Sequence, residues 1–285
     1  MLTVLDSIKL SEEYLQKKEI EAPRINAELL LADILSCKRL DLYLKFDQPL
    51  KQNEIQKYRE YISRRGKGEP LQYIIEKVEF YGMNLRVNSS VLIPRPETEI
   101  LVETIIEENK DNANLNILDI GCGSGNISIA LAKNLNNAKI FAIDISEEAL
   151  LLAKENAKEL DVLDLIQFFR GDIFHNNLKE ISSNFDLIVS NPPYVSKQDF
   201  KNLQTEIKEY EPDIAVTDFA DGLKYYRKIS EIGSDLLKHG GKIYFEIAMG
   251  QSEDVKNILK KNNFKNILSK KDYSGVERII LGERL

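Results

Sequence analysis

The run Asn191-Pro192-Pro193-Tyr194 follows an apolar stretch and has the chemistry needed to hold a planar NH₂ group. Its prolines fix the backbone and remove N–H donors, so the Pro192 carbonyl stays free to accept a hydrogen bond. The Asn191 side-chain oxygen is a second acceptor, and the Tyr194 ring can lie against the plane of the group. Two acceptors would orient the nitrogen towards an electrophile. We predict that Asn191, Pro192 and Tyr194 are catalytic and that Pro193 completes the substrate-binding loop.

A glycine-rich loop lies upstream, between the predicted strand 116–120 and a predicted helix. Glycines at such a turn let the backbone approach a ligand closely at a helix N-terminus. The spacing is not the G-x-G-x-x-G of dinucleotide sites, whose third glycine would fall at Asn126, and a P-loop motif is absent from the sequence. The residues of the loop are Gly121, Cys122, Gly123, Ser124 and Gly125.

Acidic residues stand at the ends of the next two predicted strands. Asp144 ends the second strand, where a carboxylate can hold the two hydroxyls of a ribose. Asp172 ends the third, where it can accept from an adenine amino group while Ile173 packs on the ring. Each acid alone could be an exposed loop carboxylate. Because parallel strands bring their carboxyl ends to one edge of a sheet, together they predict a nucleoside site.

This constellation resembles the class I S-adenosylmethionine-dependent methyltransferases, and N-P-P-Y resembles the loop of those that methylate planar nitrogens. The resemblance implies S-adenosylmethionine as cofactor and S-adenosylhomocysteine as product. A sulfonium is already a strong electrophile, so no metal is expected. The resemblance also places Asp119 near the amino group of the cofactor. The full set of expected cofactor-binding residues is Asp119, Gly121, Cys122, Gly123, Ser124, Gly125, Asp144, Asp172, Ile173 and Asn191.

Several further motifs resemble the release-factor glutamine methyltransferase family (HemK/PrmC). The most specific is Ile93-Pro-Arg-Pro-Glu-Thr-Glu99, which also has the character of a helix start at Pro96. This resemblance covers nearly the whole chain. It implies that the acceptor is the side-chain amide N5 of the glutamine in the Gly-Gly-Gln loop of peptide release factors. One departure is the stretch 216–220, where the family has a glycine-rich segment.

Other acceptors share the same chemistry and stay open at this point. They are a glutamine of ribosomal protein L3 and the exocyclic amines of nucleic acids, adenine N6 and guanine N2. The L3 enzymes tend to lack the contiguous P-R-P-x-T-E. The formal net charge of −7 argues against duplex nucleic acid, whose ligands usually carry a basic face. A binding module that retains a cofactor site without activity is the non-enzymatic alternative.

The pattern of apolar residues predicts two domains joined by a linker. Residues 1–74 are expected to form a small helical, substrate-recognition domain, and residues 75–93 a β-hairpin linker. In residues 94–285, strands alternate with helices, which indicates an α/β fold. We expect a Rossmann-like, mostly parallel sheet with helices on both faces. The strands are predicted at 116–120, 139–143, 166–169, 185–189, 242–247 and 277–281.

The composition and the apolar runs of the sequence bear on the cellular compartment of the protein. No stretch approaches the roughly 20 apolar residues that span a bilayer, and the first residues lack the character of an export signal. The two cysteines and two histidines are scattered, which excludes a disulfide framework and argues against a zinc site. We therefore expect a cytoplasmic protein without direct contact to duplex nucleic acid or membrane. The family resemblance implies that it acts on peptide release factors, and we expect it to be a monomer.

Overall fold

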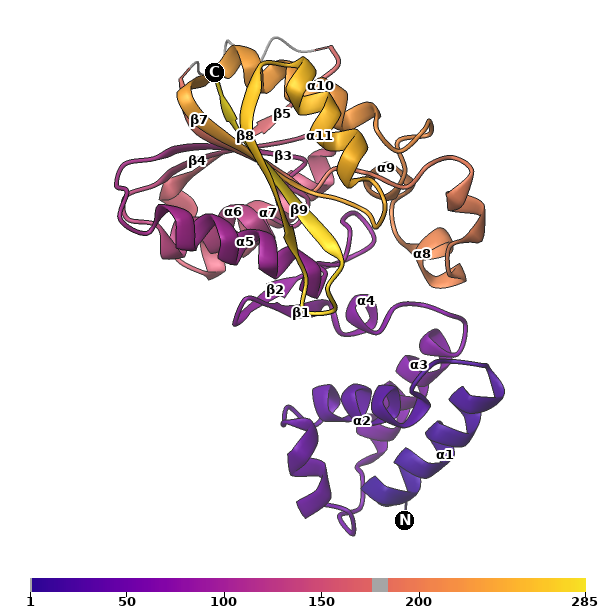
Figure 1. Ribbon diagram of the computed structural model, residues 1–285. Helices are drawn as coiled ribbons and strands as arrows, with labels where there is room; N and C mark the ends of the chain where they lie inside the picture. Colours follow the sequence, from indigo (N-terminus) through magenta and orange to yellow (C-terminus); the bar gives the residue numbers. More distant parts are fainter. Residues whose placement is uncertain (1, 176–183) are drawn as a thin grey trace. The chain divides into compact units, whose positions relative to one another are not determined.

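The computed structural model describes residues 2–175 and 184–285 (Figure 1). Contacts between backbone segments divide the chain into two compact units. The first comprises Met1–Lys77 with Gln204–Tyr210, and the second comprises Val78–Leu203 with Glu211–Leu285. The inclusion of Gln204–Tyr210 in the first unit has no counterpart in the division expected from the sequence. The predicted domain limits at residues 74 and 93 stay a prediction.

The first unit is built from helices. They are α1 (Val4–Lys17), α2 (Pro23–Ile34), the 3₁₀ helix η1 (Arg39–Leu44), α3 (Gln52–Arg65), α4 (Leu71–Ile75) and α8 (Thr205–Tyr210). A capping box starts α1, in which the Thr3 hydroxyl accepts from the backbone N–H of Asp6 at 3.2 Å. Pro23 occupies the first turn of α2, where its missing N–H has no intrahelical partner to lose. The apolar sides of the helices enclose a core of fully buried residues: Ile8, Leu15, Leu30 and Leu31.

A buried arginine joins the two sequence segments of this unit. The Arg65 guanidinium donates to Asn26 Oδ1 at 2.7 Å and to the Glu69 carbonyl at 2.8 Å. It also forms an ion pair with Glu206 at 2.9 Å. A guanidinium with several fixed partners is held in one orientation. Helix α8 is therefore anchored to the end of α3 within the unit.

The second unit is organised around a seven-stranded sheet with the order β5-β4-β3-β6-β7-β9-β8. Its strands are β3 (Asn116–Ile120), β4 (Lys139–Asp144), β5 (Ile166–Arg170), β6 (Phe185–Ser190), β7 (Leu237–Glu246), β8 (Phe264–Lys271) and β9 (Glu277–Arg284). Neighbours from β5 to β7 are parallel, and β9 is antiparallel to both β7 and β8. Strand β3 lies between β4 and β6, so the order reverses there. Ligands of such sheets bind beyond the carboxyl ends of the strands at this switch point.

Helices cover both faces of the sheet (Figure 1). One face carries α5 (Pro96–Asn109), α6 (Asn126–Asn134) and α7 (Glu147–Glu159), and the other carries α10 (Lys224–Leu236) and α11 (Ser252–Lys261). Shorter turns are η2 (Leu163–Leu165), η4 (Asp199–Asn202) and α9 (Asp213–Val216). Each layer of helices encloses its own apolar core against the sheet. The predicted fold class is confirmed.

Two strands differ from the sequence-based expectation. Strand β8 was not predicted, because most of its residues are at least partly exposed and its sequence carries no apolar run. Strand β7 begins at Leu237 rather than near residue 242, and it continues through Gly240 and Gly241. The predicted hairpin is present as β1 (Lys77–Phe80) and β2 (Met83–Arg86), with the turn at Tyr81 and Gly82.

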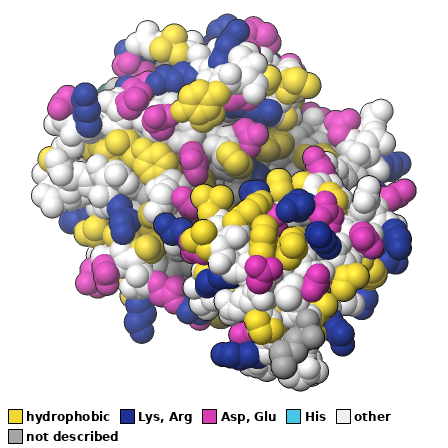
Figure 2. Space-filling model, turned by 90° about the horizontal axis from the view of Figure 1, so that it is seen from below, with side chains coloured by type: hydrophobic (Ala, Val, Ile, Leu, Met, Phe, Trp, Pro, Cys, Tyr) yellow, Lys and Arg dark blue, Asp and Glu magenta, His cyan; other side chains and the backbone are white. Residues whose placement is uncertain are grey.

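Within residues 2–175 and 184–285, no helix is long and apolar enough to cross a bilayer. On the face that Figure 2 shows, Lys and Arg side chains are interspersed with Asp and Glu side chains. Interspersed charges of both signs are typical of an ordinary solvated surface.

Candidate active site

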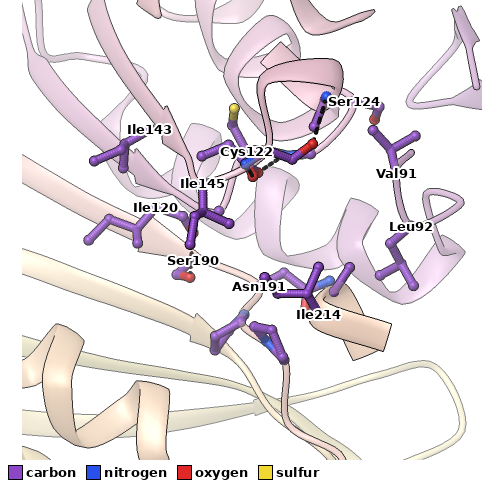
Figure 3. Close-up of a pocket in the computed structure, with 18 of the residues that line it drawn as sticks. Val91, Leu92, Ile120, Cys122, Ser124, Ile143, Ile145, Ser190, Asn191 and Ile214 are labelled. Atoms are coloured by element: carbon purple, nitrogen blue, oxygen red, sulfur yellow. Dashed lines mark hydrogen bonds between the residues drawn. The ribbon is translucent and has the colours of Figure 1, made fainter. Parts of the chain in front are cut away.

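A cavity lies at the carboxyl ends of β3, β4, β5 and β6, at the switch point of the sheet (Figure 3). The empty space between its lining residues, including the solvent on its open side, is about 1030 Å³. The glycine loop and the segments after β4, β5 and β6 contribute to its wall. Residues 90–95 and 212–215 close it from other parts of the sequence. In Figure 3, Ile143 and Ile145 lie across the cavity from Val91 and Leu92.

The three glycines of the loop serve two purposes. Gly121 and Gly123 line the cavity with positive φ values of 77° and 52°, and a Cβ on either would meet nothing within 4 Å. Their missing side chains therefore leave room for a ligand against the backbone. Gly125 also has a positive φ, 81°, but a Cβ there would lie 3.2 Å from Ala153 and Ile129. Its task is to let α6 and α7 pack closely.

Asp144 joins the end of β4 to the glycine loop. Its carboxylate accepts from the Gly123 backbone N–H and from the Ser146 backbone N–H, each at 2.9 Å. Burial raises the pKa of this carboxyl, and the backbone hydrogen bonds oppose that rise. Asp144 lines the cavity, where a carboxylate keeps further lone pairs for a ligand hydroxyl.

The end of β5 supplies a second carboxylate and an apolar wall. Asp172 accepts from the Phe174 backbone N–H at 2.8 Å and lies 2.7 Å from His175 Nδ1. Burial would raise the pKa of Asp172, but these hydrogen bonds outweigh it and the net pKa is lowered. Ile173 is buried in the cavity wall, to which Tyr225 also contributes. The structure thus brings Asp144, Asp172 and Ile173 into the wall of one cavity, and their contacts with a nucleoside stay a prediction.

Asp119 and Cys122 are both buried beside the cavity, and only Cys122 is part of its wall. The Ser128 hydroxyl donates to Asp119 Oδ2 at 2.5 Å, whereas Oδ1 has no hydrogen-bond partner in the described part of the chain. Burial, with the nearby charge of Asp144, raises the pKa of Asp119 to about 7. Burial also raises the pKa of the Cys122 thiol, which keeps it protonated and unreactive. The contact of Asp119 with a cofactor stays a prediction.

The loop Asn191–Tyr194, called the acceptor loop after its predicted task, follows β6, and its first three residues line the cavity. Asn191, Pro192 and Pro193 are in the wall, but Tyr194 is not. The partly buried Tyr194 ring contacts the apolar core beneath α10, and burial raises its pKa. Its backbone carbonyl accepts from Gln251 Nε2 at 3.0 Å. The stacking role expected for Tyr194 stays a prediction.

The stretch Ile93–Glu99 does more than start helix α5. The Arg95 guanidinium pairs with the buried Glu211, whose other oxygen accepts from the Ile93 backbone N–H at 3.3 Å. Glu99 accepts from the Tyr81 backbone N–H in the hairpin turn at 2.7 Å. The motif therefore ties the start of α5 to the hairpin and to the segment that leads into Pro212.

Sequence reasoning missed several residues of the cavity. Tyr225 and Ile214 had no local signal, because they belong to helices whose patterns indicate only packing. Ile145 directly follows Asp144 at the end of a predicted strand, and this position could have identified it as a residue of the cavity wall. Its side chain is 42% exposed. The missed wall residues include Val91, Leu92, Ile145, Ile214, Ala215 and Tyr225.

The stretch 216–220, where the sequence departs from the family pattern, is not part of the cavity wall. Its buried Asp218 accepts from the backbone N–H groups of Ala220 at 2.8 Å and Lys224 at 3.0 Å. These bonds hold the turn that leads into α10. The preceding residues Pro212, Ile214 and Ala215 do line the cavity.

Changing Gly222 to alanine should impair turnover without weakening cofactor binding. A Cβ at Gly222 would lie 2.6 Å from the Tyr194 carbonyl oxygen and 2.9 Å from Gln251 Nε2, at a φ of +81°. The acceptor loop would have to shift, and a displacement of about 1 Å in such a loop can cost up to about a hundredfold in rate. We expect kcat to fall at least about tenfold in a methyl-transfer assay. The matched control is Gly240→Ala, which has a similar φ of +76° at a remote site. A G222A enzyme with unchanged kcat would contradict the role given to this contact.

The wall fits a nucleoside attached to an amino acid better than it fits a metal. In the described ranges, no group of three or more His, Cys, Asp or Glu side chains has the arrangement of a metal site. The two glycines leave open space for a ligand, and Asp144 offers acceptors for hydroxyls. Outside the wall, the buried Asp119 has one oxygen without a hydrogen-bond partner among the described residues. This donor set suits S-adenosylmethionine, which carries a ribose, an adenine and an amino group.

Solved structures share the fold of the chain. A methyltransferase from Pyrococcus furiosus has a TM-score of 0.53 and 17% identity, and the match covers 82% of this chain and 99% of that one. A ribosomal protein L11 methylase from Lactobacillus delbrueckii subsp. bulgaricus has a TM-score of 0.50 and 21% identity, with 70% and 86% covered. At these identities the likeness shows the fold alone.

Sequence relatives define the family. Residues 6–75 match the PrmC N-terminal domain, and residues 96–209 match the methyltransferase small domain. A release factor glutamine methyltransferase from Fusobacterium nucleatum is 41% identical, over 98% of this chain and 78% of that protein. One from Clostridium acetobutylicum is 33% identical, over 99% of both chains. The chain therefore belongs to the release factor glutamine methyltransferase family.

Proposed function

We propose that the protein transfers a methyl group from S-adenosylmethionine to the side-chain amide N5 of the glutamine in the Gly-Gly-Gln loop of peptide release factors. The observation that carries this proposal is the position of Asn191 and Pro192. They stand in the wall of the same cavity as the glycine loop and Asp144. An acceptor amide held by this loop would thus face the cofactor part of the site.

The acceptor loop would orient an otherwise poor nucleophile. The lone pair of an amide nitrogen is delocalised, so the nitrogen attacks only when it is well positioned. Asn191 Oδ1 and the Pro192 carbonyl would each accept one N–H hydrogen of the glutamine amide. As positive charge develops on the nitrogen, these two oxygens would stabilise it. Tyr194 would lie against the amide plane.

The cofactor would occupy the other half of the cavity. Bound S-adenosylmethionine supplies an electrophilic methyl group on a sulfonium, and S-adenosylhomocysteine is what remains after transfer. Gly121, Gly123 and Gly125, with Cys122 and Ser124 between them, would form the backbone surface beside its methionine part, and Asp119 would serve the amino group. Asp144 would accept from the ribose hydroxyls, while Asp172 and Ile173 would flank the adenine.

The helical part, residues 1–74, would recognise the release factor, and the hairpin at 75–93 would link it to the methyltransferase part, residues 94–285. The formal net charge of −7 supports a protein acceptor rather than duplex nucleic acid. Because release factors act on ribosomes, we place the reaction in the cytoplasm. We propose that the enzyme works as a monomer.

The proposal predicts which of several acceptors receives the methyl group. Labelled S-adenosylmethionine would be supplied with unmethylated release factor, its loop variant with glutamine replaced by alanine, ribosomal protein L3, or nucleic acid. We expect label in the release factor alone, and none in its loop variant. Label in L3 or in nucleic acid instead would be compatible with the amide clamp, the pair of acceptors formed by Asn191 and Pro192, and would overturn the choice of acceptor. An absence of label from every acceptor would overturn the activity.

A further inference from the structure

A chain of three polar side chains runs from the acceptor loop into the protein interior. The Thr98 hydroxyl lies 2.6 Å from Glu246 Oε2, and Asn191 Nδ2 lies 3.2 Å from Thr98 Oγ1. Thr98 and Glu246 are 1% and 2% exposed, so bulk water does not compete for these hydrogen bonds. The three residues come from α5, the end of β6 and the end of β7. Two of the three, Thr98 and Glu246, were not predicted as site residues.

The chemistry of a hydroxyl gives this chain a direction. Thr98 Oγ1 carries a single hydrogen, and the ionised Glu246 can only accept. The hydrogen of Thr98 is therefore committed to Glu246, and the remaining lone pairs of Oγ1 can only accept. The NH₂ end of the Asn191 amide can donate to them, whereas its oxygen end cannot. Asn191 is thus held with Nδ2 towards Thr98 and Oδ1 on the opposite side of its amide.

We propose that Thr98 and Glu246 are positioning residues that fix the Asn191 amide with Oδ1 towards the acceptor nitrogen. This inference rests on the proposed amide clamp, because only a clamp needs the oxygen end of Asn191 to face the substrate. A flipped Asn191 would present an NH₂ group to the NH₂ group of the substrate, and two donors repel. Thr98 of the Pro-Glu-Thr-Glu motif and Glu246, the last residue of β7, would thereby act in the reaction by positioning Asn191.

The direction of the chain depends on the charge of Glu246. Burial raises its pKa to about 7; Glu97 on α5 adds to the rise, while Thr98, Arg278 on β9 and Asn191 oppose it. The phenol of Tyr194 also faces this carboxyl, and the Tyr226 hydroxyl binds its backbone carbonyl. A protonated Glu246 can donate to Thr98, which frees the Thr98 hydrogen for Asn191 Oδ1. The amide could then flip, so turnover should fall as pH drops through about 7.

Isosteric variants separate positioning from packing. Thr98→Val keeps the shape of the side chain and removes the hydroxyl, whereas Thr98→Ser keeps the hydroxyl. At saturating S-adenosylmethionine and pH 8 we expect T98V to lower kcat about tenfold, the effect of one lost hydrogen bond, with KM for the release factor within about twofold. T98S should retain most of kcat. Thr104→Val is the matched control, since Thr104 is a buried threonine of the same helix outside the cavity wall.

Glu246→Gln tests the charge. Its amide can donate to Thr98, as protonated Glu246 does, so E246Q should show a kcat about tenfold below wild type at pH 8. Between about pH 6 and 8.5 the kcat of E246Q should also rise less than the wild-type kcat, because the titration of Glu246 is removed. Asp119 also has a pKa raised to about 7. Any pH dependence that Asp119 causes would persist in E246Q, so the difference between the wild-type and E246Q profiles reports the contribution of Glu246 alone.

These measurements distinguish the inference from the proposed function. A wild-type enzyme without release-factor methylation would overturn the proposed function. An active wild type whose kcat is matched by T98V, or whose pH profile is shared by E246Q, would leave that function intact and overturn the positioning role. If T98V does not fold, as judged by its affinity for S-adenosylmethionine, the E246Q profile and the T98S rate still decide the question.

Discussion

Replacing Asn191 by alanine should lower kcat by about 10²–10³-fold, the usual effect of removing one preorganised group that stabilises charge in a transition state. The variant keeps the Pro192 carbonyl but loses the acceptor that would hold the second hydrogen of the substrate amide. The amide would then rotate freely about one hydrogen bond. Its nitrogen would seldom point towards the methyl group, so the loss should appear in kcat.

Cofactor affinity is the measurement that gives this result its meaning. The glycine loop and Asp144 do not depend on Asn191 for any hydrogen bond in the described structure. Asn191 is also among the predicted cofactor-binding residues, but we expect most cofactor contacts to come from the glycine loop and Asp144. The dissociation constant for S-adenosylmethionine, measured by calorimetry, should therefore stay within about threefold of wild type. The matched control is Asn262→Ala, which removes a side-chain hydrogen bond of 2.9 Å to the Ile258 carbonyl away from the cavity. An N191A enzyme with near-normal kcat would disprove the clamp.

Replacing Gly121 by valine should weaken S-adenosylmethionine binding by about a hundredfold, about 2.7 kcal/mol. Gly121 has a φ of +77°, and a side chain there would enter the open space of the cavity. The substitution has two effects, strain in the left-handed backbone region and occupation of the space meant for the ligand. Only the second effect is specific to the site.

Gly275 separates these two effects. Its φ is +82°, and a Cβ there also meets nothing within 4 Å, but it does not line the cavity. Gly275→Val should therefore carry a similar strain, of about 1–2 kcal/mol, and leave cofactor affinity unchanged. Thermal unfolding would measure the strain in both variants, and calorimetry would measure binding. Equal losses of affinity in G121V and G275V would contradict the assignment of the glycine loop to the cofactor.

The cofactor half of the site could be predicted from the sequence because its parts are local. Gly121–Gly125, Asp144 and Asp172 each follow a short apolar run that reads as a parallel strand. Parallel strands bring their carboxyl ends to one edge, so residues distant in sequence converge without knowledge of side-chain geometry. The Asn191 loop obeys the same rule at the end of β6.

The supporting contacts could not be predicted in this way. Thr98 and Glu246 are 148 positions apart, and Thr98 and Asn191 are 93 apart. Thr98 was visible only as part of a helix start, and Glu246 only as a residue at the end of a strand. Their contact depends on how α5 packs against the sheet, which no periodic pattern specifies.

The two departures in the fold also have physical causes. Strand β8 lies at the edge of the sheet, where one partner and partial exposure suffice, so its sequence lacks the apolar run of a central strand. Strand β7 passes through His239, Gly240 and Gly241, which resemble a turn in sequence. Gly240 has a φ of +76°, and the pairing of β6 with β7 changes register between Phe185 and Leu187. The strand continues past this irregularity.

The most direct test of the account is to locate the methyl group on the product. Release factor would be incubated with the enzyme and S-adenosylmethionine, digested, and sequenced by mass spectrometry. The account predicts one added methyl group on the side-chain amide nitrogen of the glutamine in the Gly-Gly-Gln loop, formed about 10²–10³-fold more slowly by the N191A enzyme. A methyl group on any other atom or residue of the release factor would contradict it.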